Sequence, residues 1–114
     1  MNQVKVKFGG IQMAIIGLTL ITALIHLILG IGMLSEPLGI LFLFNFVGYV
    51  ALVTGLYFVP QLSSKRSQIR YALMAFAAIT VIAWIPAGTK DALAYFDKLV
   101  EVVLVVLLYL ESRA

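Results

Sequence analysis

This sequence of 114 residues contains no cysteine and little charge. Without a thiol the chain has no disulfide, no thiolate nucleophile, no iron–sulfur cluster and no thiolate zinc site. Charged residues make up only 11% of the chain, whereas soluble domains carry about 25%. The chain is also 63% hydrophobic, with a mean hydropathy of +1.12. We therefore expect an integral membrane protein.

Long apolar runs divide the chain into four expected membrane helices. Their approximate bounds are 11–34, 38–59, 69–87 and 92–110. Pro37 and Gly39 indicate a tight turn between the first two helices, and Pro86 indicates the end of the third. Thr89 or Asp91 is expected to cap the fourth. The predicted fold class is an all-α, integral membrane four-helix bundle made of two helical hairpins.

The first apolar run, from Ile11 to Leu34, is longer than the roughly 7–15 residues of a signal-peptide core. We therefore expect it to remain as a membrane helix. The sequence has no linker or low-complexity tract, so residues 1–114 are predicted to form a single membrane domain.

Basic residues beside the expected spans predict the orientation, because Lys and Arg concentrate on the cytoplasmic side. One side carries Lys5, Lys7, Lys65, Arg66, Arg70 and Arg113. The other side carries Lys90 and Lys98. We expect both termini in the cytoplasm of a prokaryote, with the protein in its plasma membrane. Membrane orientation accounts for these charges, so nucleic acid is not expected as a partner.

Polar residues at membrane depth are the candidate functional residues, because an ionisable side chain near the bilayer centre is energetically costly. They are His26, Asn45, Thr80, Asp97, Lys98 and Glu101. Their estimated depths are compatible with one intramembrane polar cluster. Glu101 is expected to pair with Lys98 three residues earlier and with His26 of the first span. We expect Lys98 to extend its amine to the outer headgroups.

Three interpretations of this cluster are open: a hydrogen-bonded network that fixes helix register, a proton relay or ion pathway, and part of a metal or haem site. We favour the first. A single histidine cannot supply a second axial or tetrahedral nitrogen, so a metal or haem would need ligands from a partner. No metal or other cofactor is therefore expected. The serines are expected in loops or tails away from His26, so no catalytic residue and no enzymatic activity are expected.

The stretches TALIHLILGIGM, LFLFNFVGYVALVTGLYF and YFDKLVEVVLVVLLYLE are similar to a family of small four-span membrane proteins of archaea and some bacteria, whose function is uncharacterised. The residues that carry the resemblance are His26, Asn45 to Gly48, Asp97, Lys98 and Glu101. It implies no activity. In size and layout, though not in motif, the chain also resembles small accessory subunits of large membrane oxidoreductases, including the copper monooxygenases of ammonia-oxidising archaea.

The expected function is that of a non-catalytic accessory or structural subunit that packs against a larger membrane protein complex, such as a membrane oxidoreductase or monooxygenase. Its expected partners are membrane lipids and other membrane protein subunits or further copies of itself. The alternative is a small homo-oligomeric protein that conducts or transports protons or ions through His26 and Glu101. Four short spans enclose little room, so this alternative requires an oligomer.

Overall fold

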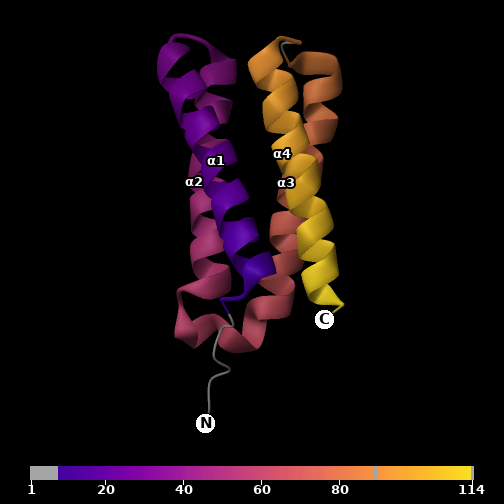
Figure 1. The fold of residues 1–114 in the computed structure, drawn as a ribbon. Helices are drawn as coiled ribbons and strands as arrows, with labels where there is room; N and C mark the ends of the chain where they lie inside the picture. The colour runs from indigo at the N-terminus through magenta and orange to yellow at the C-terminus, as the bar shows by residue number, and fades with distance from the viewer. Residues whose placement is uncertain (1–7, 89, 114) are drawn as a thin grey trace.

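The computed structural model describes residues 8–88 and 90–113, and within these residues the chain is helical. Its elements are α1 (Gly10–Gly32), α2 (Pro37–Tyr57), the 3-10 helix η1 (Pro60–Lys65), α3 (Arg66–Ala87) and α4 (Ala92–Ser112). Figure 1 shows the four α-helices side by side. The expected all-α fold with four helices is confirmed.

The helix ends follow from local chemistry. Pro37 lies in the first turn of α2, where its missing N–H removes no intrahelical hydrogen bond. Asp91 caps α4 by accepting a hydrogen bond from the backbone N–H of Ala94 at 2.9 Å. The alternative cap, Thr89, lies outside the described residues. The polar stretch after Pro60 is helical rather than an irregular loop, and α3 begins at Arg66 instead of near residue 69.

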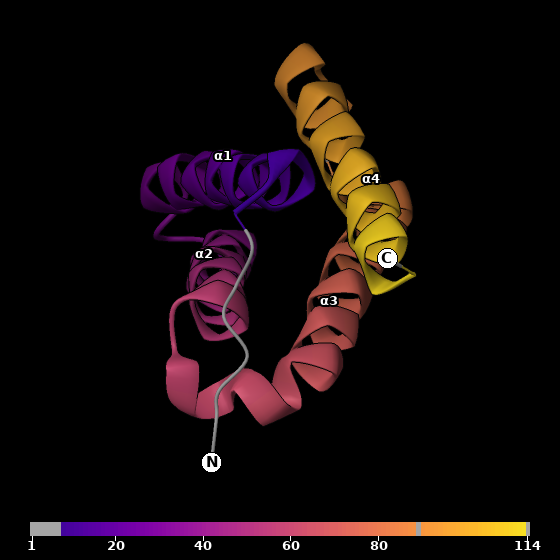
Figure 2. The same cartoon turned by 60° about the horizontal axis from the view of Figure 1, so that its bottom comes forward.

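The helices pack as two neighbouring pairs. Helix α1 packs on α2 and α3 on α4, and the pairs meet through contacts of α1 with α4 and of α2 with α3. In Figure 2, η1 crosses from α2 to α3 at the end where α1 begins and α4 ends. The opposite turn is tight, since a Cβ at Gly39 would collide with the backbone carbonyl of Met33.

All four helices contribute to a buried apolar core. Its fully buried or nearly fully buried members include Ile15, Tyr49, Val53, Leu56, Leu73, Ala77, Leu104 and Leu108. Large apolar side chains also cover the outer faces of the helices, as expected for a surface that meets lipid.

Helices α1 and α2 and the segment Pro60–Pro86 are long and apolar enough to cross a membrane. Three such helices indicate a membrane protein, as expected. Helix α4 is not among them, because Asp97, Lys98 and Glu101 interrupt its apolar sequence.

Candidate functional site

Three charged side chains of α4 point into the protein. Asp97, Lys98 and Glu101 are 3%, 9% and 0% exposed. The Lys98 ammonium donates a hydrogen bond to Glu101 Oε1 at 2.6 Å and lies 3.2 Å from Asp97 Oδ2. The expectation that Lys98 extends to the outer headgroups is therefore wrong. The two carboxylates are buried close together in a low dielectric, where they repel each other strongly unless a cation pairs with both. The Lys98 amine therefore stays with them instead of reaching the headgroups.

Asp97 joins α4 to α1. The Thr22 hydroxyl donates to Asp97 Oδ1 at 2.5 Å, and His26 Nε2 lies 3.7 Å from Asp97 Oδ2. His26 Nδ1 lies 2.7 Å from the Thr22 carbonyl oxygen, which can only accept, so this nitrogen carries a proton. The nearest acid to His26 on α4 is thus Asp97, whereas the sequence had suggested Glu101.

Glu101 joins α4 to α2. The Tyr49 hydroxyl donates to Glu101 Oε2 at 2.5 Å, while Glu101 Oε1 accepts from Lys98. Both carboxylate oxygens act as acceptors, which is the pattern of an ionised group. Tyr49 and Glu101 are both fully buried. We call the set Thr22, His26, Tyr49, Asp97, Lys98 and Glu101 the inner network.

Asn45 and Thr80 form a separate pair beside the inner network. Thr80 Oγ1 donates to the Phe76 carbonyl at 2.8 Å and lies 3.5 Å from Asn45 Oδ1. Both residues line a cavity of about 310 Å³, which His26, Asp97 and Lys98 also line. The cavity therefore brings together five of the six polar residues singled out in the sequence, and Glu101 lies behind Lys98.

The inner network holds a set of atoms with the geometry of metal ligands. One ligand atom each from His26, Asp97 and Glu101 lies within 4.8 Å of the others. The Lys98 ammonium already bonds both carboxylates, so a metal ion would have to displace it. The donor set thus fits an internal ion pair better than a metal centre.

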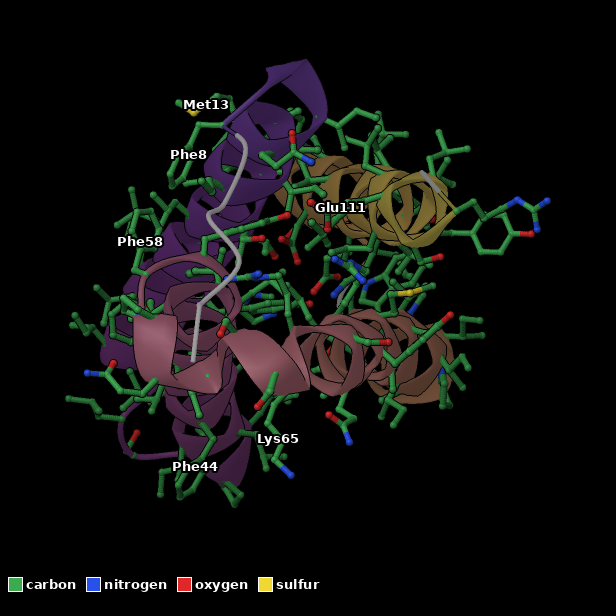
Figure 3. The ribbon with its side chains drawn as sticks, turned by 90° about the horizontal axis from the view of Figure 1, so that it is seen from below. Phe8, Met13, Phe44, Phe58, Lys65 and Glu111 are labelled. Atoms are coloured by element: carbon green, nitrogen blue, oxygen red, sulfur yellow. The ribbon has the colours of Figure 1, made fainter. Side chains whose placement is uncertain are left out.

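A second polar cluster lies at the end where α1 begins. Glu111 of α4 accepts hydrogen bonds from Gln12 of α1 at 2.8 Å, Tyr57 of α2 at 2.7 Å and Arg70 of α3 at 2.8 Å. We call these four residues the end cluster. In Figure 3, which looks at the molecule from this end, Glu111 points in among the helices while Met13 points outward.

The electrostatics of the end cluster favour an ionised Glu111. Burial by itself would raise the pKa of this carboxyl, but the hydrogen bonds from Tyr57, Arg70 and Gln12 outweigh it. Its pKa is therefore held below the ordinary value. One carboxylate in this way ties all four α-helices together.

An apolar layer separates the inner network from the end cluster. Glu101 and Glu111 are ten residues apart on α4, about 15 Å along a helix. Every helix places buried side chains between these levels: Ile15 on α1, Val53 on α2, Leu73 and Ala77 on α3, Leu104 and Leu108 on α4. Thr19 of α1 is also buried between the clusters, and its hydroxyl donates to the Ile15 carbonyl of its own helix at 2.7 Å. The buried side chains between the two clusters are therefore mainly apolar.

Sequence reasoning missed several members of both clusters. Tyr57 was missed because a tyrosine near a helix end suggests an interfacial belt, and Tyr49 because it lies in the middle of an apolar span. One available signal was spacing, since Tyr49 follows Asn45 by four residues and Thr22 precedes His26 by four. The remaining missed residues are Gln12, Arg70 and Glu111.

Comparisons with known protein families, with curated proteins and with solved structures gave no match. The function therefore has to be argued from the geometry of this chain alone.

Proposed function

We propose that this chain is a non-catalytic membrane protein that packs as an accessory subunit against a larger membrane protein complex, such as a membrane oxidoreductase or monooxygenase. The observation that carries the proposal is that its buried polar groups satisfy one another. Among the described residues, every buried side-chain nitrogen or oxygen atom has a hydrogen-bond partner. A closed network of this kind fixes the relative positions of helices and leaves their outer faces for other membrane components.

The proposal places all four helices across the membrane, α4 included. Its charges face the interior, and the large side chains that it exposes are aliphatic or aromatic: Leu93, Tyr95, Phe96, Leu99, Val102, Val103, Val106, Tyr109 and Leu110. A helix with this distribution meets lipid with an apolar surface although its sequence contains charges. We also propose that the chain belongs to the family of small four-span membrane proteins of archaea and some bacteria.

Both termini are proposed to lie in the cytoplasm of a prokaryotic cell, with the protein in the plasma membrane. In Figure 1, α1 begins and α4 ends at the same end of the molecule as η1 and the start of α3, the segments that contain Lys65, Arg66 and Arg70. Because Lys98 is bonded inside the protein, it no longer counts among the basic residues of the opposite flank. The charge bias that favours this orientation is thus stronger than the sequence suggested.

The absence of catalysis in this proposal rests on the surroundings of His26, which is the single histidine of the chain. The hydroxyl beside it belongs to Thr22, which is fully buried and donates to Asp97. Substrate could not reach this hydroxyl without opening the interface between α1 and α4, so the arrangement is a poor nucleophile–base pair.

Purification of the natively expressed protein in a mild detergent tests the accessory role. We expect it to migrate on a native gel with larger membrane proteins in a fixed ratio. A strictly monomeric protein, purified at native abundance without any partner, would remove the proposal. The control is the same preparation after mild SDS treatment, which should release the free chain.

A second candidate function, a small homo-oligomeric proton- or ion-conducting or transport protein, is favoured by one observation. The cavity reaches His26, Asp97 and Lys98 at membrane depth, and Lys98 connects them to Glu101. Ionisable groups around an intramembrane cavity are typical of ion and proton pathways. The apolar layer opposes conduction through one chain, so a pathway would have to form between copies or by rearrangement.

Flux measurements in proteoliposomes distinguish this candidate from the accessory role. A transport protein would show flux for the wild type that falls with His26→Ala and with Glu101→Gln. Lys90→Met, which removes an exposed cation outside the inner network, is the control and should keep wild-type flux. Background flux in all of these proteins would exclude transport.

A further inference from the structure

The cavity has a polar inner wall and an apolar, aromatic mouth. Asp97 and Lys98 are nearly buried at its inner wall, while Phe44 is 66% exposed and Ile79 64% exposed at its rim. The rim residues come from α2 and α3, so the cavity opens toward the membrane between these helices. Its volume of about 310 Å³ lies in the range of sites for small molecules.

The inner network contains more negative than positive charges. Asp97 and Glu101 contribute two negative charges and Lys98 one positive charge, so the inner network carries a formal charge of −1 when His26 is neutral. A net charge in a low-dielectric interior is costly. A cation that enters from the cavity would neutralise it.

Asp97 is the group that such a cation would meet. It lines the cavity directly, whereas Glu101 lies behind Lys98. An ionised carboxylate has about four acceptor positions, and the hydrogen bond from Thr22 and the ion pair with Lys98 use two of them. His26 Nε2 lies 3.7 Å from Asp97 Oδ2, which is too far for a hydrogen bond.

The aromatic wall suits the same kind of ligand. The rings of Phe42 and Phe76 line the cavity and are held in place by edge contacts, Phe42 with His26 at 5.6 Å and Phe76 with Tyr49 at 4.8 Å between ring centres. Aromatic faces attract organic cations and also bury apolar chains.

We propose that this cavity is a binding site for a lipophilic amine: its ammonium group lies against Asp97, and its apolar body lies between α2 and α3 against Phe42 and Phe76. This site goes beyond the accessory role and is independent of it, because it needs neither a partner subunit nor transport.

Three probes with the same apolar body test the proposal: octylamine, octanol and octanoate, each added to the purified full chain in lipid nanodiscs at neutral pH. Trp84 is the single tryptophan and lines the cavity, so its fluorescence reports binding. We expect octylamine to bind at least about tenfold more tightly than octanol, and octanoate more weakly than either. Equal affinity for all three probes, or preference for octanoate, would overturn the proposal.

Asp97→Asn should lower octylamine affinity by about tenfold or more and leave octanol affinity unchanged, because it removes one charge with little change of shape. Glu101→Gln removes a charge of the same network without touching the cavity wall, and it should weaken octylamine binding in the same direction. Glu36→Gln, at an exposed acid outside the cavity, is the matched control. Unchanged octylamine binding in both Asp97→Asn and Glu101→Gln would refute the site.

Discussion

Replacing Lys98 by methionine removes the ammonium that two buried carboxylates share, while keeping a side chain of similar length. The formal charge of the inner network falls from −1 to −2, with Asp97 and Glu101 left in one buried cluster. Breaking a buried ion pair by removing one partner costs about 3–5 kcal/mol. Protonation of one carboxylate would relieve part of this cost, so we expect a loss of about 3 kcal/mol in the free energy of unfolding.

The double variant Lys98→Met with Glu101→Gln gives the decisive comparison. It restores the formal charge to −1 and removes the repulsion between the two acids, so it should be more stable than Lys98→Met alone by at least about 1 kcal/mol. If the stability costs of the two single substitutions simply added, the double variant would instead be the least stable of the three.

The measurement is unfolding by SDS in mixed micelles, followed by helical circular dichroism and by Trp84 fluorescence. The control is Lys65→Met, because Lys65 is an exposed lysine at the end of η1, outside both clusters. The reasoning is wrong if Lys98→Met is as stable as Lys65→Met within about 0.5 kcal/mol, or if adding Glu101→Gln lowers the stability of Lys98→Met further.

Three further predictions concern other parts of the fold. Tyr49→Phe should cost about 1–3 kcal/mol in the same unfolding assay, because a buried carboxylate loses a hydrogen bond. Gly39→Ala should cost about 1–3 kcal/mol through its collision with the Met33 carbonyl, whereas Gly17→Ala, whose Cβ meets no atom within 4 Å, should be neutral or stabilising by up to about 1 kcal/mol. The lowered pKa of Glu111 gives stability that is present above the ordinary pKa of a glutamate and is lost as the pH falls through the lowered value. Unfolding measured over that range should show this loss in the wild type, and a Glu111→Gln variant should lack it.

The helices could be predicted because the information that sets them is local. Apolar runs, Pro37 and Asp91 mark where α1, α2 and α4 begin or end, and each acts within a few residues of its own position. The pairing of Lys98 with Glu101 also follows from a spacing of three residues on one helix face.

The members of the two clusters could not be predicted because their partners are distant in the sequence. Tyr49 and Glu101 are 52 residues apart, and Tyr57 and Glu111 are 54 apart. Composition does not say which face α4 presents to α1 and α2, so the direction of Lys98 was misjudged. Asp97 can equally face water at an interface or Thr22 in the interior until the rotation of α4 is known.

The inward-facing charges of α4 bear on how the protein is made. A charged residue near the centre of a helix adds about 2.5–3.5 kcal/mol to the cost of leaving the translocon for lipid. In the proposed four-span arrangement, the last helix would enter the bilayer poorly by itself and would depend on Thr22, His26 and Tyr49, which are synthesised earlier. The first two helices would then have to be in the membrane before the fourth could insert.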